Sequence, residues 1–576
     1  MTQILDGFWL PKDIRQRILT PDIEWITLKY QGGRPSESDG PGTVAARWPK
    51  LSLKQWGNLI QALQKARTTP PKNFFIRLNS ALQHLTERFK DPSDLLDQIA
   101  LKALPAYTGY SSEMIQFVLG ALDLMPVNTL EKIIQLPLPD VVRSRYIRLR
   151  EFSDLDGRIR LYETKSKNPI QRWLNRPGSG FLKTEPAKPE MVLGYAAGNV
   201  IGTSHLISLL GQVSALVEVS QENGNSRFPI VLVKNSRQEP IFTPLIFSAI
   251  EEFDPELLSS LAILIWDYEN QELQETLISQ SDLVIAAAAD FTIEQIEAVI
   301  QKVQRLDHPI RFHQHGHKVS FTTLGLPYLK KNAVFSIKGN PDRIDVVTLL
   351  SAVDSIFWDQ YGCLSSRVHF VEQGDPEYFS PKEYGNILTE KIRLLSTFIP
   401  RGAIPLHGIH NRFEKYAALI SSGKIHLCST YEDDFLVVID ERPWTSSIFH
   451  NVINDCVERS IIIRPVKDIQ EIPDRYLSWL PPKNLQTLSI AIDGPKDETW
   501  SPRFDRFVES VGLRGVTGIR TIGRGPFPQL AYSWDGYLPV DTAIRRPAGW
   551  FTTVEFENTA QQISETYELF LARGLI

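Results

Sequence analysis

The stretch "MVLGYAAGNVIGTSHL" (residues 191–206) joins a short apolar run to a helical pattern through a Gly-Asn turn. The run is continuously apolar rather than alternating, which is typical of a strand covered on both faces of a sheet. Gly198 and Gly202 free the backbone of the turn, and the helix is expected to begin near Ser204. A strand that leads directly into a helix predicts a parallel βαβ unit.

The chain repeats this pattern on the C-terminal side of the stretch. Apolar runs follow at residues 229–236, 261–266, 282–290, 310–312, 367–372, 434–440 and 460–466, and helical patterns such as 291–304 separate some of them. Residues 51–136 have helical spacing instead, and a linker rich in Pro, Lys and Gly occupies residues 175–190. The alternation of strands and helices predicts an α/β fold.

Composition and charge exclude several classes of protein. At 576 residues the chain is too long for one simple core. A net charge of −5, from 62 basic and 67 acidic residues, gives no electrostatic argument for binding nucleic acid. No signal peptide and no apolar run long enough to span a membrane is found. The three cysteines are sparse and odd in number, which favours a reducing cytoplasm.

One cysteine lies where a nucleophile would be placed. Cys363, in "FWDQYGCLSS" (357–366), falls between a helix end and a strand start, directly after Gly362. A tight turn of this kind exposes the thiol and leaves backbone N–H groups that can hold an oxyanion. An inert core cysteine remains the alternative at this point. Cys428 and Cys456 have the pattern of packing positions.

Three other turns permit either a structural or a cofactor-binding interpretation. The Gly198–Asn199 turn opens a helix, whose N-terminus can hold an anion, but an ordinary strand-to-helix turn has the same pattern. Lys234 ends a strand in "VLVKNSRQEP" (231–240), as a solvated charge or as a cation for a nucleotide. Small residues at Ala287 and Ala288 permit close approach of a dinucleotide, or simple helix–sheet packing.

Three histidines alternate in "RFHQHGHKVSF" (311–321), so a strand would place them on one face. His313, His315 and His317 therefore suggest a metal site, which His407 and His410 could complete. Gly316 interrupts the face, however, and no Asp, Glu or Cys follows at ligand spacing. We therefore expect no metal, and assistance by His315 or His317 in protonating a leaving thiolate or an alkoxide stays open.

The order of these elements resembles the aldehyde dehydrogenase superfamily, and more closely the LuxC-like fatty-acyl-CoA reductases. The similar segments are "AGNVIG", "VKNSRQEP" and "WDQYGCLSS", with support from residues 108–115, 315–321 and 533–539. The resemblance covers roughly residues 45–560. The chain departs from the family at Ile201, where Pro is usual, and has no match to the Glu-x-Phe-Gly-Pro element. The long separation of Asn199 from Cys363 suggests insertions, with residues 221–228 as a candidate.

The resemblance implies an aldehyde dehydrogenase-like α/β fold with a definite division of the chain. We expect an N-terminal helical region and linker over residues 1–186 and a Rossmann-type NADPH-binding domain over 187–320. A catalytic α/β domain with the cysteine would follow over 321–550, and a C-terminal helix over 551–576. The superfamily also suggests a homo-oligomer.

The resemblance also implies a mechanism. Cys363 as thiolate would attack a long-chain acyl thioester, while Asn199 and the Cys363 backbone N–H hold the oxyanion. NADPH would then reduce the acyl-cysteine to a fatty aldehyde. The cofactor-binding residues that the resemblance implies are Gly198, Lys234, Ser236, Ala287, Ala288 and Asp290.

Gln314 bears on the direction of the chemistry. In oxidising relatives the similar segment reads Glu-Leu-Gly-Gly-Lys, and its Glu activates the water that hydrolyses the acyl-cysteine. This chain reads Gln314-His315-Gly316-His317-Lys318, and glutamine is no base at neutral pH. The resemblance thus favours reduction or acyl transfer over oxidation.

Three functions follow from these observations. The first is reduction of a fatty acyl-CoA or acyl-carrier substrate, with an acyl-protein synthetase or acyltransferase as the partner that the resemblance suggests. The second is an acyltransferase-like relative that passes the acyl-cysteine to another acceptor. The third is a catalytically silent scaffold with the same fold.

Overall fold

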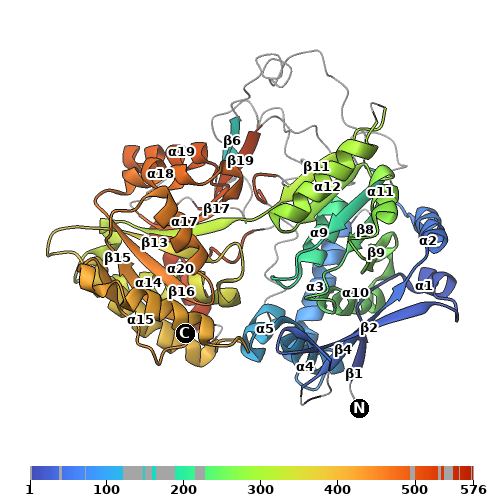
Figure 1. Ribbon diagram of the computed structural model, residues 1–576, viewed down its shortest axis with the longest axis horizontal. Coiled ribbons are helices and arrows are strands. Elements are labelled where there is room, and N and C mark those ends of the chain that lie inside the picture. Colours follow the sequence, from blue (N-terminus) through green and yellow to red (C-terminus); the bar gives the residue numbers. More distant parts are fainter. Residues whose placement is uncertain are drawn as a thin grey trace.

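The described part of the chain is organised around three β-sheets (Figure 1). The computed structural model describes residues 3–37, 40, 42–71, 73–120, 147–148, 158–163, 189–213, 227–305, 307–492, 500–529, 533–537, 549–556, 558–572 and 574. Most of the linker at 175–190 and of the candidate insertion at 221–228 lies outside these residues. No helix in the described ranges is both long and apolar enough for a membrane span.

The N-terminal region is only partly helical. It begins with a four-stranded sheet in the order β1-β4-β2-β3. The strands are β1 (Gln3–Asp6), β2 (Glu24–Gln31), β3 (Arg34–Ser36) and β4 (Val44–Lys50), with α1 (Lys12–Ile18) after β1. The helices predicted from residue 51 onward are α2 (Leu53–Ala66), α3 (Phe74–Lys90), α4 (Leu95–Thr108) and α5 (Ser112–Leu119). Ser111 caps α5 by accepting a hydrogen bond from the Met114 backbone N–H.

The five-stranded sheet is wholly parallel, in the order β11-β10-β7-β8-β9. The strands are β7 (Met191–Tyr195), β8 (Ile230–Lys234), β9 (Leu261–Leu264), β10 (Leu283–Ala287) and β11 (Arg311–His315). Every residue of the first four is buried, as the continuous apolar runs predict. The strand order reverses between β7 and β10, and ligands of such sheets bind beside this reversal, at the carboxyl ends of the strands.

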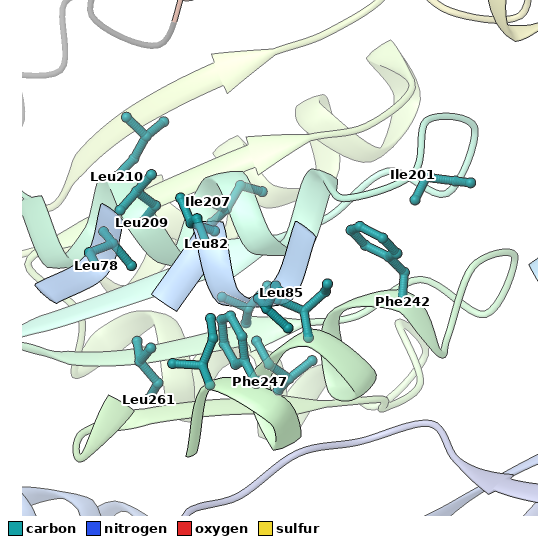
Figure 2. Close-up of a cluster of buried hydrophobic side chains, with 14 of the residues drawn as sticks. Leu78, Leu82, Leu85, Ile201, Ile207, Leu209, Leu210, Phe242, Phe247 and Leu261 are labelled. Atoms are coloured by element: carbon teal, nitrogen blue, oxygen red, sulfur yellow. The ribbon is translucent and has the colours of Figure 1, made fainter. Parts of the chain in front are cut away.

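Helices cover both faces of this sheet. They are α9 (Thr203–Val213), α10 (Phe242–Phe253), α11 (Gln271–Ser279) and α12 (Asp290–Val303). Figure 2 shows how Leu78, Leu82 and Leu85 of α3 enter the same core as side chains of α9 and α10. Ile201, which departs from the family pattern, is buried in this core, so the apolar side chain at this position contributes packing.

The ten-stranded sheet carries the cysteine and has the order β14-β15-β16-β13-β12-β17-β18-β19-β6-β5. Its strands are β12 (Val319–Leu324), β13 (Ser366–Glu372), β14 (Ile425–Leu427), β15 (Leu436–Asp440), β16 (Ser460–Val466), β17 (Leu485–Ala491), β18 (Gly518–Thr521), β19 (Gly549–Val554), β6 (Arg158–Glu163) and β5 (Ile147–Arg148). The long helices beside it are α14 (Arg343–Ile356), α15 (Pro381–Phe398), α16 (His407–Ala417), α17 (Ser446–Asp455), α19 (Pro502–Arg514) and α20 (Thr559–Ala572).

The observed division of the chain differs from the expected one at its two ends. β6, from the region expected to be N-terminal and helical, pairs antiparallel with β19 and so extends the ten-stranded sheet. α20, which was expected to be a separate terminal helix, contributes Ile563 and Phe570 to a core shared with α14. Both differences arise from pairing between segments far apart in sequence, which local hydrophobic patterns do not report.

Candidate active site

A cavity of about 990 Å³ lies between the five-stranded and ten-stranded sheets. Its lining includes the turns after β7, β8 and β10, the end of β11, and Cys363. Only three residues, Gly316 to Lys318, connect β11 to β12, so the two sheets meet at this point. The cavity therefore occupies the place where the strand order of the smaller sheet predicts a ligand.

The turn before Cys363 has an unusual backbone. Trp358, Asp359 and Gln360 are consecutive non-glycine residues with positive φ, at 56°, 47° and 64°. Each such residue costs on the order of 1–2 kcal/mol because its Cβ crowds the following carbonyl group. Other interactions must therefore hold the run in place.

A fully buried ion pair holds this turn. Asp359 Oδ1 accepts a hydrogen bond from Arg459 Nε at 2.7 Å, and both side chains are 0% exposed. The second carboxylate oxygen accepts from the Gly402 backbone N–H at 3.0 Å. Arg459 also donates to the Ile399 carbonyl oxygen at 3.0 Å. All the charge of Asp359 is thus compensated inside the protein.

Further hydrogen bonds set the position of the cysteine. The Gln360 side chain accepts from the Ser460 backbone N–H at 2.8 Å and donates to the Ser366 carbonyl oxygen at 3.0 Å. Ser320 Oγ donates to the carbonyl oxygen of Cys363 at 2.7 Å. The side chains of Asp359 and Gln360 therefore stabilise the turn from the side away from the cavity, since neither of them lines it.

The segment at residues 108–115 supports the same turn. Tyr110 Oη donates to the Asn199 carbonyl oxygen at 2.5 Å, and its ring lies 5.2 Å from that of Trp358. Asn199 Nδ2 donates to the carbonyl oxygen of Tyr361 at 2.9 Å. Asn199 and Cys363 both line the cavity, so the fold brings these two predicted residues together.

Cys363 is a protonated thiol at neutral pH in this environment. Burial raises the pKa of Cys363 to about 11, and the negative charge of Asp535 acts in the same direction. A hydrogen bond from the Gln486 side chain and the charge of Lys318 oppose this shift without reversing it. The thiol therefore needs a proton acceptor before it can attack a carbonyl.

A buried polar network beside the sulfur was not predicted from the sequence. Asp535 accepts from Gln486 Nε2 at 2.5 Å and faces His315 Nδ1 at 3.0 Å. The His315 ring is stacked on Trp534, with ring centroids 3.7 Å apart. Although burial opposes ionisation, Lys318, His315 and Gln486 together lower the pKa of Asp535 to about 2. Asp535 belongs to "SWDGYLP" (533–539), which the resemblance singled out without giving it a role.

Two predicted cofactor-binding turns lie side by side in the lining of the cavity. Gly198, Lys234 and Ser236 all line it. A Cβ on Gly198 would lie 2.2 Å from Ser236 Oγ, so only glycine permits this approach. Lys234 is only 6% exposed, and its Nζ lies 3.9 Å from the ring centroid of Tyr268. Burial, with the charge of Arg237, lowers the pKa of Lys234 to about 7.

Ala287 and Ala288 also line the cavity, whereas Asp290 is absent from its lining. Asp290 Oδ1 instead accepts from the backbone N–H of His317 at 2.7 Å. A Cβ on Gly316 would lie 2.4 Å from this oxygen, so the Asp290 carboxylate packs directly against the connection between the two sheets. The structure thus gives Asp290 a structural contact in place of the predicted contact with a cofactor.

Gln314 lies on the other face of β11 from the cavity-lining histidines. His313 and His315 line the cavity, and Gln314 does not. Gln314 pairs with Ala286, which packs into the core formed with Ile293 and Ile296 of α12. Since side chains alternate along a strand, the Gln314 side chain points away from Cys363. The comparison of Gln314 with the water-activating Glu of oxidising relatives therefore stays a prediction, without support from this geometry.

The three histidines also differ in their surroundings. The His313 ring is stacked on Tyr537 at a centroid distance of 4.2 Å. The pKa of His317 is lowered by burial and by the charge of Arg367. Across the part of the chain that the structure describes, no group of three His, Cys, Asp or Glu side chains is arranged to hold a metal ion.

Comparisons with known proteins agree with this architecture. The family model described as acyl-CoA reductase (LuxC) matches residues 223–546, which include Lys234, Cys363 and Asp535. No curated protein sequence matches the chain.

Solved structures with a similar fold include aldehyde dehydrogenase 21 from Physcomitrella patens, in complex with the reaction product succinate. Its TM-score is 0.54 at 10% identity, over 96% of this chain and 98% of that one. An E. coli NADP-dependent enzyme matches with a TM-score of 0.53 at 9% identity, over 92% and 95%. Methylmalonate-semialdehyde dehydrogenase (DddC) from Oceanimonas doudoroffii matches with a TM-score of 0.51 at 12% identity, over 91% and 97%. The predicted aldehyde dehydrogenase-like fold is confirmed.

The ion pair behind the turn leads to a stability prediction. Arg459→Met leaves the Asp359 carboxylate buried without its partner, so we expect the free energy of unfolding to fall by about 3–5 kcal/mol. The matched control is Lys50→Met, which removes the exposed ion pair with Glu24, whose side chains are 58% and 66% exposed. The control should cost about 0–1 kcal/mol. Urea unfolding measures both, and equal losses would contradict the role assigned to the buried pair.

Proposed function

The chain belongs to the LuxC acyl-CoA reductase family, and from this membership we propose that it reduces a long-chain fatty acyl thioester to a fatty aldehyde, with NADPH as reductant. The observation that carries the proposal is the position of Cys363. Its thiol lines the same cavity as Lys234 and the turn that contains Gly198. An acyl group on the sulfur and a dinucleotide along the strand ends would therefore meet in one cavity.

Acylation uses groups at the Cys363 end of the cavity. The sulfur, as thiolate, attacks the carbonyl carbon of the acyl group, whose proposed donor is CoA, a carrier protein or a partner enzyme. The backbone N–H of Cys363 and the second N–H of the Asn199 amide are the proposed donors to the oxyanion. The original thiolate then leaves, and the acyl group remains on Cys363.

The residues at the Lys234 end fit a phosphorylated dinucleotide. In the described part of the chain no carboxylate lies within ion-pair distance of Lys234, so its buried ammonium group has only aromatic rings as recorded neighbours. Trp266 Nε1, which also lies in this part of the cavity, is buried without a hydrogen-bond partner there. Arg237 adds a second cation beside Lys234. Ribose hydroxyls and a 2′-phosphate would satisfy these donors, and a bound NADPH would supply the hydride.

The proposed activity leads to a direct test. The protein, incubated with tetradecanoyl-CoA and NADPH, should consume NADPH and release tetradecanal. Without NADPH, mass spectrometry should find tetradecanoyl mass on the Cys363 peptide. Cys363→Ala should abolish both signals, and Cys428→Ser should leave both in place.

Other outcomes separate the alternative functions. An adduct on Cys363 without oxidation of NADPH would favour an acyltransferase-like relative. An absence of both signals with acyl-CoA and with an acyl-carrier donor would favour the scaffold.

The environment of Lys234 predicts how NADPH binding depends on pH. With a pKa of about 7, Lys234 is protonated below pH 7 and increasingly neutral above it. The dissociation constant for NADPH should therefore rise as pH increases, by up to about tenfold for each unit above the pKa. Calorimetric titration between pH 7 and pH 8.5 measures this.

Lys234→Arg provides the matched control, because arginine stays charged throughout this range. Its dissociation constant for NADPH should vary little with pH. A flat profile for the unmodified protein would contradict the proposed contact between Lys234 and the phosphate.

A further inference from the structure

We propose that His315, oriented by Asp535, is the general base that takes the proton from the Cys363 thiol and later returns it to the departing thiolate. This inference rests on the proposed acyl chemistry at Cys363 and adds a residue to it.

His315 belongs to the same cluster of side chains as the Cys363 thiol. The Gln486 side chain donates a hydrogen bond to Asp535, Asp535 is hydrogen-bonded to His315, and both Gln486 and Asp535 shift the pKa of Cys363. All four residues line the same cavity. The cysteine, the carboxylate and the imidazole thus form one cluster, although β11, the nucleophile turn, β17 and the 533–537 segment supply its members separately.

Orientation of the ring is the second argument. His315 Nδ1 faces Asp535 Oδ2 at 3.0 Å, which directs Nε2 to the opposite side of the ring. The stacking on Trp534, with an interplanar angle of 13°, prevents the ring from turning out of this plane. The side chains of His315 and Asp535 are 4% and 2% exposed. A carboxylate that holds one imidazole nitrogen fixes the tautomer in which the other nitrogen accepts a proton.

The charge balance is the third argument. Although burial opposes ionisation of Asp535, the charge of Lys318 and the hydrogen bonds with His315 and Gln486 lower its pKa, so Asp535 is itself a poor proton acceptor. Its fixed negative charge also disfavours a thiolate nearby. Transfer of the proton to His315 creates a cation beside both anions, while Lys318 supplies a second one. The cluster keeps the same net charge before and after the transfer, so a buried thiolate forms without an uncompensated charge.

The neighbours of the other cavity histidines differ from those of His315. The His313 ring is stacked on Tyr537. Asp290 is hydrogen-bonded to the backbone N–H of His317. The His315 ring is hydrogen-bonded to the Asp535 carboxylate.

Protons and electrons balance in the proposed step. The Cys363 S–H bond breaks, an N–H bond forms on His315, and the sulfur attacks the acyl carbonyl carbon. When the tetrahedral intermediate collapses, its bond to the original thiol sulfur breaks. The departing sulfur takes the proton from the imidazolium, and His315 becomes neutral again. No oxidant or reductant takes part in this half of the reaction.

The test measures the thiolate itself. The full-length protein is treated with iodoacetamide at pH 6 to pH 10.5, without acyl donor or cofactor, and alkylation of the Cys363 peptide is followed by mass spectrometry. His315→Gln should slow alkylation at pH 7.5 by at least about tenfold. The rate should recover toward that of the unmodified protein at pH 10.5, where the thiol ionises unaided. Slower alkylation at pH 7.5 also shows that the variant is folded, because unfolding would expose the thiol and speed its alkylation.

Two further variants distinguish a general-base role of His315 from a role in packing alone. His313→Gln, two residues along the same strand face, should leave the pH profile within about twofold of the original. Asp535→Asn should also slow alkylation at pH 7.5, because it removes the group that orients His315. If Asp535 acts only by repelling the thiolate, Asp535→Asn will instead accelerate alkylation, and that result overturns the proposal.

The proposal and the proposed function can fail separately. Equal profiles for His315→Gln and the unmodified protein overturn the role of His315, whatever activity tetradecanoyl-CoA shows. Slower alkylation in His315→Gln together with no reduction of tetradecanoyl-CoA supports the base and rejects that reaction for that donor.

Discussion

The buried ion pair between Asp359 and Arg459 is the constraint on which the active-site arrangement depends. It joins the turn before Cys363 to the start of β16, and both side chains are completely buried. Left-handed backbone occurs on both sides of the pair, at residues 358–360 and at Glu458 and Arg459. Neither strained segment is favourable alone. Each is held because relaxing it would leave a charge buried without a partner, which costs more than the strain.

The two ends of the cavity follow one electrostatic principle. Cys363 and Lys234 are both removed from water, and burial shifts the pKa of each toward its neutral form. A neutral group costs little free energy to bury, whereas its charged form needs a partner of opposite charge. At one end the proposed partner is the imidazolium of His315, and at the other a phosphate. The reactive charges would thus form only when the chemistry requires them.

Features of the fold and of the site that depend on neighbouring residues could be predicted from the sequence. Features that depend on contacts between distant residues could not. The buried strands, the helix that begins at Thr203 and the turn around Cys363 follow from hydrophobic runs and glycine positions within a few residues. The network of His315 and Asp535 joins residues 220 positions apart, and no local pattern marks it. The orientation of the Gln314 side chain could not be predicted for a related reason. An alignment of letters does not show which face of β11 meets the cavity, and a shift of one residue reverses that face.

By itself, the sequence determined the alternation of buried strands and helices, the candidate nucleophile Cys363, and the resemblance to acyl-CoA reductases. These are properties of short segments, because burial periodicity and turn geometry act within a few residues. Only the tertiary structure decided which side chains surround the sulfur, that "WDQ" supports the turn from behind, and that Asp290 holds the connection between the sheets. These contacts depend on the packing of two sheets against each other. That packing is set by the summed burial of distant segments and leaves no signal in any one of them.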